Sequence, residues 1–229
     1  MKRLRLPDGR ELCYELTRKP VRNINFRVKP DGVVYVSASG RVAVKRIEQL
    51  LTERADFLLA AAQRLSERER QGEVTLESVK WLGREFSVRI IASAREKAVL
   101  EHDEMRVFSC RTGDEEWLRG LIKSELTANF ARLCAELNKE VRAQLTAAGL
   151  VPPPTRITIK DMKSRWGSCS YTRGHISINF QLYAYPRETV LSVFWHEYAH
   201  YWQHDHSPAF YALVERFCPE YRRWNGLLK

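Results

Sequence analysis

Near its C-terminal end the chain reads His196-Glu197-Tyr198-Ala199-His200-Tyr201-Trp202-Gln203-His204-Asp205-His206. Four of the six histidines of the protein lie in this stretch. His196 and His200 are four positions apart, and on a helix this spacing puts both imidazole rings on one face, where they can share a metal ion. Glu197 is rotated by about 100° from His196 on the same helix. It can therefore reach a water molecule on the metal without being a ligand itself.

The helix that carries these histidines is predicted to be buried, because residues 190–202 are apolar on nearly every side. A buried carboxylate and two buried imidazoles are costly unless a partner satisfies them. A zinc ion with its bound water is such a partner, and the pattern then makes Glu197 the catalytic acid/base. The alternative interpretation is a pair of core histidines, His196 and His200, that form hydrogen bonds to their neighbours.

The third zinc ligand can be argued from geometry. His204 continues the spacing of four, but a separation of eight residues spans about 12 Å along a helix axis, too far for one ion. The sequence at 205–208 favours a turn, and Pro208 suits the start of another helix over 208–217. We therefore expect His206 to be the third ligand, with the fourth position left for water. Two glutamates of the following segment are rivals, Glu215 and Glu220.

The segments before this helix are predicted from capping, turn and strand patterns. A long helix is expected from Asp114, which can cap it, to Gly149. Strands are expected at 156–160 and 175–180, and Pro186 is expected to open the histidine-bearing helix. These elements define a predicted C-terminal domain over 112–229, mostly helical with a small sheet.

The N-terminal part is predicted to be a mostly antiparallel β-sheet with one helix. Two Pro-Asp-Gly turns, around Asp8 and Asp31, separate runs of alternating apolar residues and indicate two hairpins. An apolar stripe that includes Phe57 predicts a helix over 43–68. Further strands are expected at 78–82, 85–92 and 105–109, with a charged loop over 93–104. The expected fold class is α+β, with an N-terminal domain at 1–111.

Charge and cysteine content limit the partners and the compartment. The net charge is +10, and residues 1–46 hold twelve Lys or Arg against four Asp or Glu, so +8 of it lies there. Such a surface can meet nucleic acid, nucleotide phosphates or an acidic substrate, or simply be solvated. Five scattered cysteines, the absence of a signal-peptide pattern and the absence of an apolar span indicate a cytoplasmic protein without a membrane segment.

Several motifs together resemble the YgjP-like zinc metallopeptidases. They are Arg165-Trp166-Gly167-Ser168-Cys169-Ser170, Gly174-His175-Ile176-Ser177-Ile178-Asn179, the histidine stretch, Pro219-Glu220-Tyr221, and Val28-Lys29-Pro30-Asp31-Gly32 near the N-terminus. The resemblance implies a zincin-like catalytic half, with His196, His200 and His206 as zinc ligands and Glu197 as the catalytic residue. Tyr198 replaces the usual aliphatic residue after the glutamate.

The leading hypothesis is a zinc-dependent peptidase whose peptide or protein substrate pairs with the strand at 175–180. Arg165 is a candidate for substrate or oxyanion binding, whereas Gly167 is interpreted as a backbone device. One alternative keeps the metal site but makes the protein a nucleoside triphosphate pyrophosphohydrolase. Another is a non-enzymatic nucleic-acid-binding protein with a structural metal, ranked last because the basic half lacks a known nucleic-acid motif.

Overall fold

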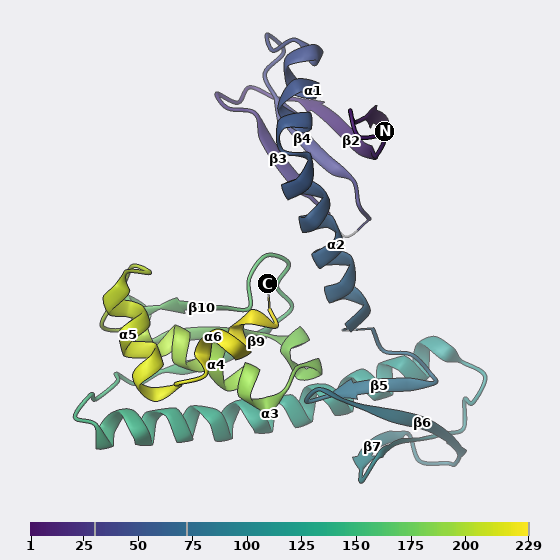
Figure 1. The fold of residues 1–229 in the computed structure, drawn as a ribbon. Helices are drawn as coiled ribbons and strands as arrows, with labels where there is room; N and C mark the ends of the chain where they lie inside the picture. Colours follow the sequence, from purple (N-terminus) through teal and green to yellow (C-terminus); the bar gives the residue numbers. More distant parts are fainter. Residues whose placement is uncertain (30, 72, 229) are drawn as a thin grey trace. The chain divides into compact units, whose positions relative to one another are not determined.

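The computed structural model describes residues 1–29, 31–71 and 73–228, with no side chains described for 68–71. The chain forms two compact units, Met1–Gln71 and Gly72–Lys229 (Figure 1). With 42% helix, 27% strand and three small mixed sheets, the predicted α+β class is confirmed.

The N-terminal unit contains a four-stranded sheet with the strand order β1-β2-β4-β3. Its strands are β1 (Lys2–Arg5), β2 (Glu11–Arg18), β3 (Asn25–Val28) and β4 (Val34–Ala38). Strands β1 and β2 pair antiparallel, as do β3 and β4, so both predicted hairpins are confirmed. Strands β2 and β4 run parallel. Pro30, part of the second predicted turn, lies outside the described residues.

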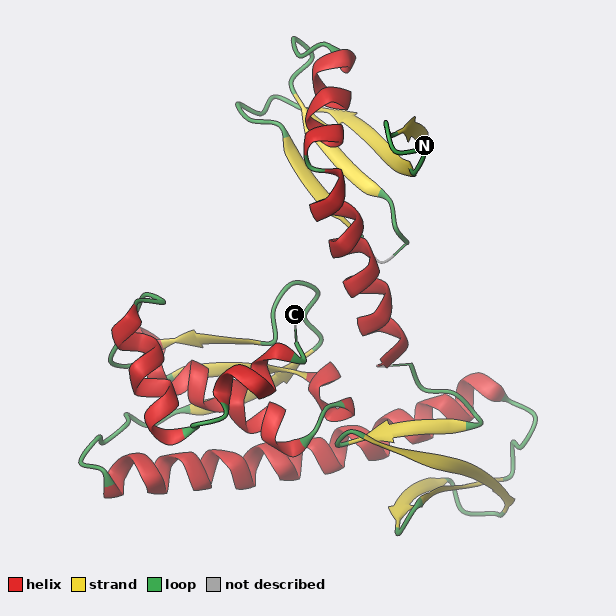
Figure 2. Cartoon of the chain, viewed as in Figure 1, coloured by secondary structure: helices red, strands yellow, loops and turns green. Residues whose placement is uncertain are grey.

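Two helices, α1 (Val44–Glu53) and α2 (Ala55–Gln71), cover one face of this sheet (Figure 2). The prediction of one continuous helix is wrong, because Arg54 leaves the helical region, with φ −112° and ψ 11°. The buried residues Ile47, Leu51, Ala55 and Leu58 nevertheless keep helical spacing across the break, so they share one face toward the core. Phe57 lies off this face and is 68% exposed.

A second four-stranded sheet belongs to the C-terminal unit, with the order β5-β6-β8-β7. Its strands are β5 (Ser78–Trp81), β6 (Arg84–Ala92), β7 (Lys97–Glu101) and β8 (Glu104–Ser109). The predicted strands are present, but the predicted loop at 93–104 is wrong because it contains β7. Charged residues at both ends of β7 leave only a short apolar run, Ala98-Val99-Leu100, of which Ala98 is buried.

The turn between β5 and β6 forms backbone hydrogen bonds with the C-terminal half of the chain. The Leu82 amide donates to the Tyr183 carbonyl at 2.8 Å, and the Gly83 amide donates to the Ala184 carbonyl at 3.2 Å. Both turn residues have positive φ, and a Cβ on Gly83 would lie 3.0 Å from a Pro186 side-chain atom. The two compact units divide at 71/72. The domain boundary at 111/112 stays a prediction.

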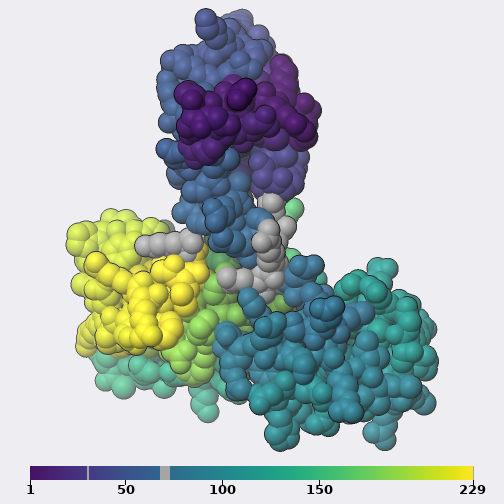
Figure 3. All heavy atoms as spheres, turned by 45° about the vertical axis from the view of Figure 1, so that its right-hand side comes forward, coloured from purple at the N-terminus to yellow at the C-terminus, as the bar shows by residue number. Residues whose placement is uncertain are grey.

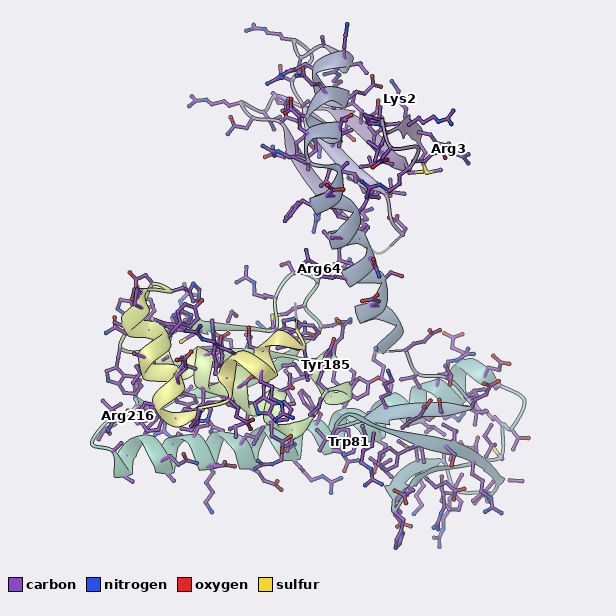
Figure 4. The ribbon with its side chains drawn as sticks, viewed as in Figure 1. Lys2, Arg3, Arg64, Trp81, Tyr185 and Arg216 are labelled. Atoms are coloured by element: carbon purple, nitrogen blue, oxygen red, sulfur yellow. The ribbon has the colours of Figure 1, made fainter. Side chains whose placement is uncertain are left out.

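Helix α3 (Glu115–Ala147) begins where predicted, because the Asp114 side chain accepts a hydrogen bond from the Trp117 amide at 3.0 Å. One side of α3 is buried along its whole length, from Leu118 to Leu145. It packs against β7 and β8 near its start, then against the last sheet and α4 (Arg187–Ala199). Trp81 and Tyr185 lie close to this junction (Figure 4).

The last sheet has the strand order β10-β11-β9, so β11 is its central strand. Its strands are β9 (Arg156–Lys160), β10 (Gly167–Ser170) and β11 (His175–Asn179), and β11 pairs parallel with β9 and antiparallel with β10. Short 3-10 helices span Tyr171–Arg173 and Phe180–Ala184.

Helices α5 (Pro208–Phe217) and α6 (Tyr221–Gly226) complete the C-terminal unit. In Figure 3 these last residues, in yellow, lie next to the segments that precede them in the chain, in green. The predicted helix over 208–217 is confirmed. In the described part of the chain, no helix has the length and apolar character to cross a membrane.

Candidate metal centre

Helix α4 is buried, as its sequence predicted. Pro186 precedes its first residue, and side chains on all sides are enclosed, including Val190, Phe194 and Tyr198. The Tyr198 hydroxyl donates to Asn138 of α3. The helix ends at Ala199, so His196 and His200 lie at its C-terminal end, where the chain is free to change direction.

A turn after α4 brings the chain back over these two histidines. Ser207 caps α5 by accepting a hydrogen bond from the Phe210 amide at 3.4 Å, and Pro208 occupies the first turn. As a result, possible ligand atoms of His196, His200 and His206 all lie within 4.8 Å of one another. The Nε2 atoms of His196 and His206 are 3.1 Å apart.

The other ring nitrogens of two histidines have partners that orient the rings. The His200 Nδ1 lies 3.1 Å from the Gln203 carbonyl oxygen, and a carbonyl can only accept, so Nδ1 carries the proton. In the neutral ring this leaves the lone pair on Nε2. The His196 Nδ1 lies 2.8 Å from the Tyr221 hydroxyl. Metal-bound histidines are usually held by such outer partners.

This donor set fits a metal ion. Burial, followed by the charges of His200 and His206, lowers the pKa of His196 to about 3, which keeps the ring in the neutral form that binds metals. Two nitrogens on a tetrahedral zinc ion lie roughly 3.3–3.4 Å apart, given zinc–nitrogen bonds of about 2.0–2.1 Å, close to the distance between His196 and His206. Three imidazoles also suit several other transition metals.

The rival ligands lie elsewhere and have other partners. His204 is exposed and stacks on Tyr171, with ring centroids 3.9 Å apart. Glu215 pairs with Arg222 at 2.6 Å, and Glu220 pairs with Arg223 at 2.8 Å. Among the described residues, the three-histidine cluster therefore includes none of the three rivals.

Glu197 lies one helical position beyond His196 and is only 5% exposed. Burial raises the pKa of its carboxyl to about 8, while the charge of Arg165 acts in the opposite direction. A cation held by the three histidines would also favour the ionised carboxylate, since an opposite charge nearby stabilises it. The pKa of Glu197 therefore depends on its burial, on Arg165 and on a cation bound by the three histidines.

Gly167, the first residue of β10, makes room for this carboxyl group. A Cβ placed on Gly167 would lie 2.8 Å from both Cγ and Cδ of Glu197, a distance that real Cβ atoms do not reach. The backbone of β10 therefore packs directly against the side chain of Glu197. Glycine is required at position 167 because the β10 backbone lies so close to Glu197. This close approach is the specific form of the backbone role predicted for Gly167.

These residues line a cleft of about 460 Å³. One wall is the segment from Arg165 to Tyr171, which includes β10; the other is α4 with His206 and Asn225. Asn179 holds the first wall in place, because its buried side-chain amide donates to the carbonyls of Met162 at 2.7 Å and Arg165 at 2.8 Å. The predicted site residues therefore meet in one cleft.

A family model for the YgjP-like metallopeptidase domain matches residues 22–229. The chain belongs to this family. The resemblance predicted from its motifs is therefore confirmed, and the family, with the histidine cluster, indicates a metal ion without identifying it. Comparisons with curated proteins and with solved structures give no match.

Three residues of this YgjP-like site were not predicted to have the contacts that they make. Tyr221 bonds to His196, Asn179 fixes the Arg165 segment, and Gly167 accommodates Glu197. All three belong to motifs that support the family resemblance. The motifs include these three residues. Their contacts, however, join segments that are far apart in the sequence, so residue spacing alone does not predict those contacts.

Replacing Gly167 by alanine is expected to displace the Glu197 side chain and to lower metallopeptidase activity by about a hundredfold, the cost of a misplacement of about 1 Å. The matched control is Gly120→Ala, since a Cβ there has no neighbour within 4 Å. That control should keep full activity, with helix α3 slightly stabilised. Kinetics with a peptide substrate and thermal melting of both variants provide the check. Equal activities would show that Glu197 tolerates the methyl group.

Proposed function

We propose that this protein is a zinc-dependent metallopeptidase, with His196, His200 and His206 as the zinc ligands and Glu197 as the catalytic acid/base. The observation that supports it best is the juxtaposition of a buried carboxylate and three clustered imidazoles in one cleft. A buried carboxylate in a cleft with a strongly raised pKa is typical of a catalytic group.

The chemistry is divided between the ion and the protein. Zinc bound by three imidazoles supplies a Lewis acid that polarises a carbonyl group and lowers the pKa of water from 15.7 to about 7. Glu197 accepts the proton of the attacking water and donates it to the leaving amine. Tyr221 and the Gln203 carbonyl keep the rings of His196 and His200 turned toward the cleft.

A peptide substrate is proposed to pair with β10. The sequence-based prediction that it pairs with the strand at 175–180 is wrong, because β11 has a partner strand on each side. Strand β10 lines the cleft, and in the described part of the chain its outer edge has no strand partner. An extended peptide can add to such an edge through backbone hydrogen bonds, which places its carbonyl groups along the wall that contacts Glu197.

Arg165 is proposed to bind the substrate. It lines the cleft, and its charge acts on Glu197, so its side chain lies within electrostatic range of the reacting groups. A guanidinium group there suits either the carbonyl oxygen that develops negative charge or a carboxylate of the substrate.

The test is a substrate panel with the purified full chain loaded with zinc. We expect cleavage of unstructured peptides and no release of pyrophosphate from nucleoside triphosphates, and we expect cleavage to stop when a chelator removes the metal. Release of pyrophosphate without peptide cleavage would support the pyrophosphohydrolase alternative instead. Metal binding with neither activity would favour a non-enzymatic role.

A further inference from the structure

The N-terminal unit gathers several chain segments at the end of its sheet where α1 starts. Strands β2 and β4 are parallel, so both finish at this end, while β3 is antiparallel to β4 and starts there. The loop after β2 and the turn after β4 also touch. Arg18 donates to the Ser39 carbonyl at 2.7 Å, and the Lys19 amide donates to the Ala38 carbonyl at 3.0 Å.

These segments carry six basic residues, which we call the basic cluster. Three belong to the end of β2 and the loop that follows, and three to the turn after β4 and the first turn of α1. All six side chains are exposed. The members of the basic cluster are Arg18, Lys19, Arg22, Arg41, Lys45 and Arg46.

Acidic residues do not neutralise the basic cluster. Between Glu15 and Glu48 the sequence contains one acidic residue, Asp31. Asp31 lies in the turn between β3 and β4, at the opposite end of the sheet, where it accepts hydrogen bonds from the Val33 amide and the Tyr35 hydroxyl. Glu48 is bonded to the buried Tyr14 hydroxyl at 2.7 Å. In the described part of this unit, only Arg10 forms ion pairs.

We propose that the basic cluster binds nucleic acid through its phosphate backbone. Four of its six members are arginines, whose planar guanidinium groups match phosphate oxygens. Polar side chains suited to hydrogen bonding with phosphates and sugars lie between them, including Asn23, Asn25 and Ser39. Because contacts of this kind recognise phosphate and not base edges, binding is independent of sequence.

The surroundings of the cluster favour nucleic acid over other acidic partners. Stable binding to a membrane surface usually needs apolar side chains besides basic residues, and a peptide is usually held by an aromatic or aliphatic anchor. Among the described residues of this unit, the large exposed hydrophobic side chains are Met1 and Phe57, and neither belongs to the segments that form the cluster. Phosphate contacts need no such anchor.

The experiment measures the affinity of the full chain for labelled single-stranded DNA, duplex DNA and RNA by fluorescence anisotropy at several salt concentrations. One variant, called the patch variant, reverses three charges of the basic cluster through Arg22→Glu, Arg41→Glu and Lys45→Glu. A matched control reverses two arginines and one lysine outside the cluster, at Lys2, Arg3 and Arg64, which are labelled in Figure 4. Circular dichroism establishes that both variants are folded.

The patch variant is expected to bind at least about tenfold more weakly than the wild type, and its salt dependence should flatten by about 2.7 in log–log slope if all three side chains contact duplex phosphates. The control should lose less than about threefold, through the long-range field alone. Equal losses in the two variants, or no measurable binding by the wild type, overturn the proposal. Tighter binding of polyglutamate or of anionic vesicles than of nucleic acid, lost in the same variant, also overturns it.

Discussion

Glu197→Gln is expected to lower peptidase activity by about 10²–10⁴-fold, the usual contribution of a general acid–base group. The amide nearly matches the carboxyl group in size, so it should fit beneath Gly167, where a larger group would not. It cannot accept the proton of the attacking water, however. The histidine cluster is unaltered by this change, and the variant should therefore bind as much zinc as the wild type.

Steady-state kinetics and elemental analysis on the same preparations test this expectation. The control is Glu220→Gln, which makes the same chemical change at an exposed residue whose partner is Arg223. An exposed ion pair contributes at most about 1 kcal/mol, so this control should keep its activity and its zinc. A Glu197→Gln variant with activity close to that of the wild type would eliminate Glu197 as the acid/base. Loss of zinc in that variant would instead give Glu197 a role in holding the metal.

Much of the site follows from sequence because its parts lie close together in the chain. The spacing of His196 and His200, the apolar character of α4 and the turn before Pro208 are all local signals. They place His206 over the end of α4 without any knowledge of the remaining fold. The hairpins of the N-terminal unit and the Asp114 cap are likewise local, since each depends on a few consecutive residues.

The errors have two causes: some elements carry only a weak local signal, and others depend on partners distant in the sequence. Strand β7 forms a hairpin with the adjacent β8, and its charged ends leave only a short apolar run, Ala98-Val99-Leu100, as a local signal. Strand β10 is absent from the predicted strands, yet it is the edge strand that lines the cleft. The central position of β11 depends on the pairing order of three separated segments, which residue patterns do not specify. The break at Arg54 involves neither proline nor glycine and carries no local signal.

His206→Ala is expected to abolish tight zinc binding, because it removes one of three proposed ligands and leaves the two of α4. The loss should exceed the roughly 10–100-fold that follows removal of an outer-shell partner. Zinc content after dialysis measures this directly. Thermal melting adds an independent readout: zinc at a hundred times its Kd should stabilise the wild type by about 2.7 kcal/mol and have almost no effect on the variant.

His204→Ala is the matched control, since it removes a second exposed histidine only two positions away. His204 stacks on Tyr171 and bonds to the His200 carbonyl, so its loss should leave the zinc content unchanged. The opposite pattern, with zinc lost in His204→Ala and kept in His206→Ala, would reassign the third ligand. If both variants kept their zinc, Glu215 would become the candidate for the third ligand. It would then have to break its ion pair with Arg222 to reach the metal. The geometry opposes both results, because His206 already lies within 3.1 Å of the His196 ring nitrogen.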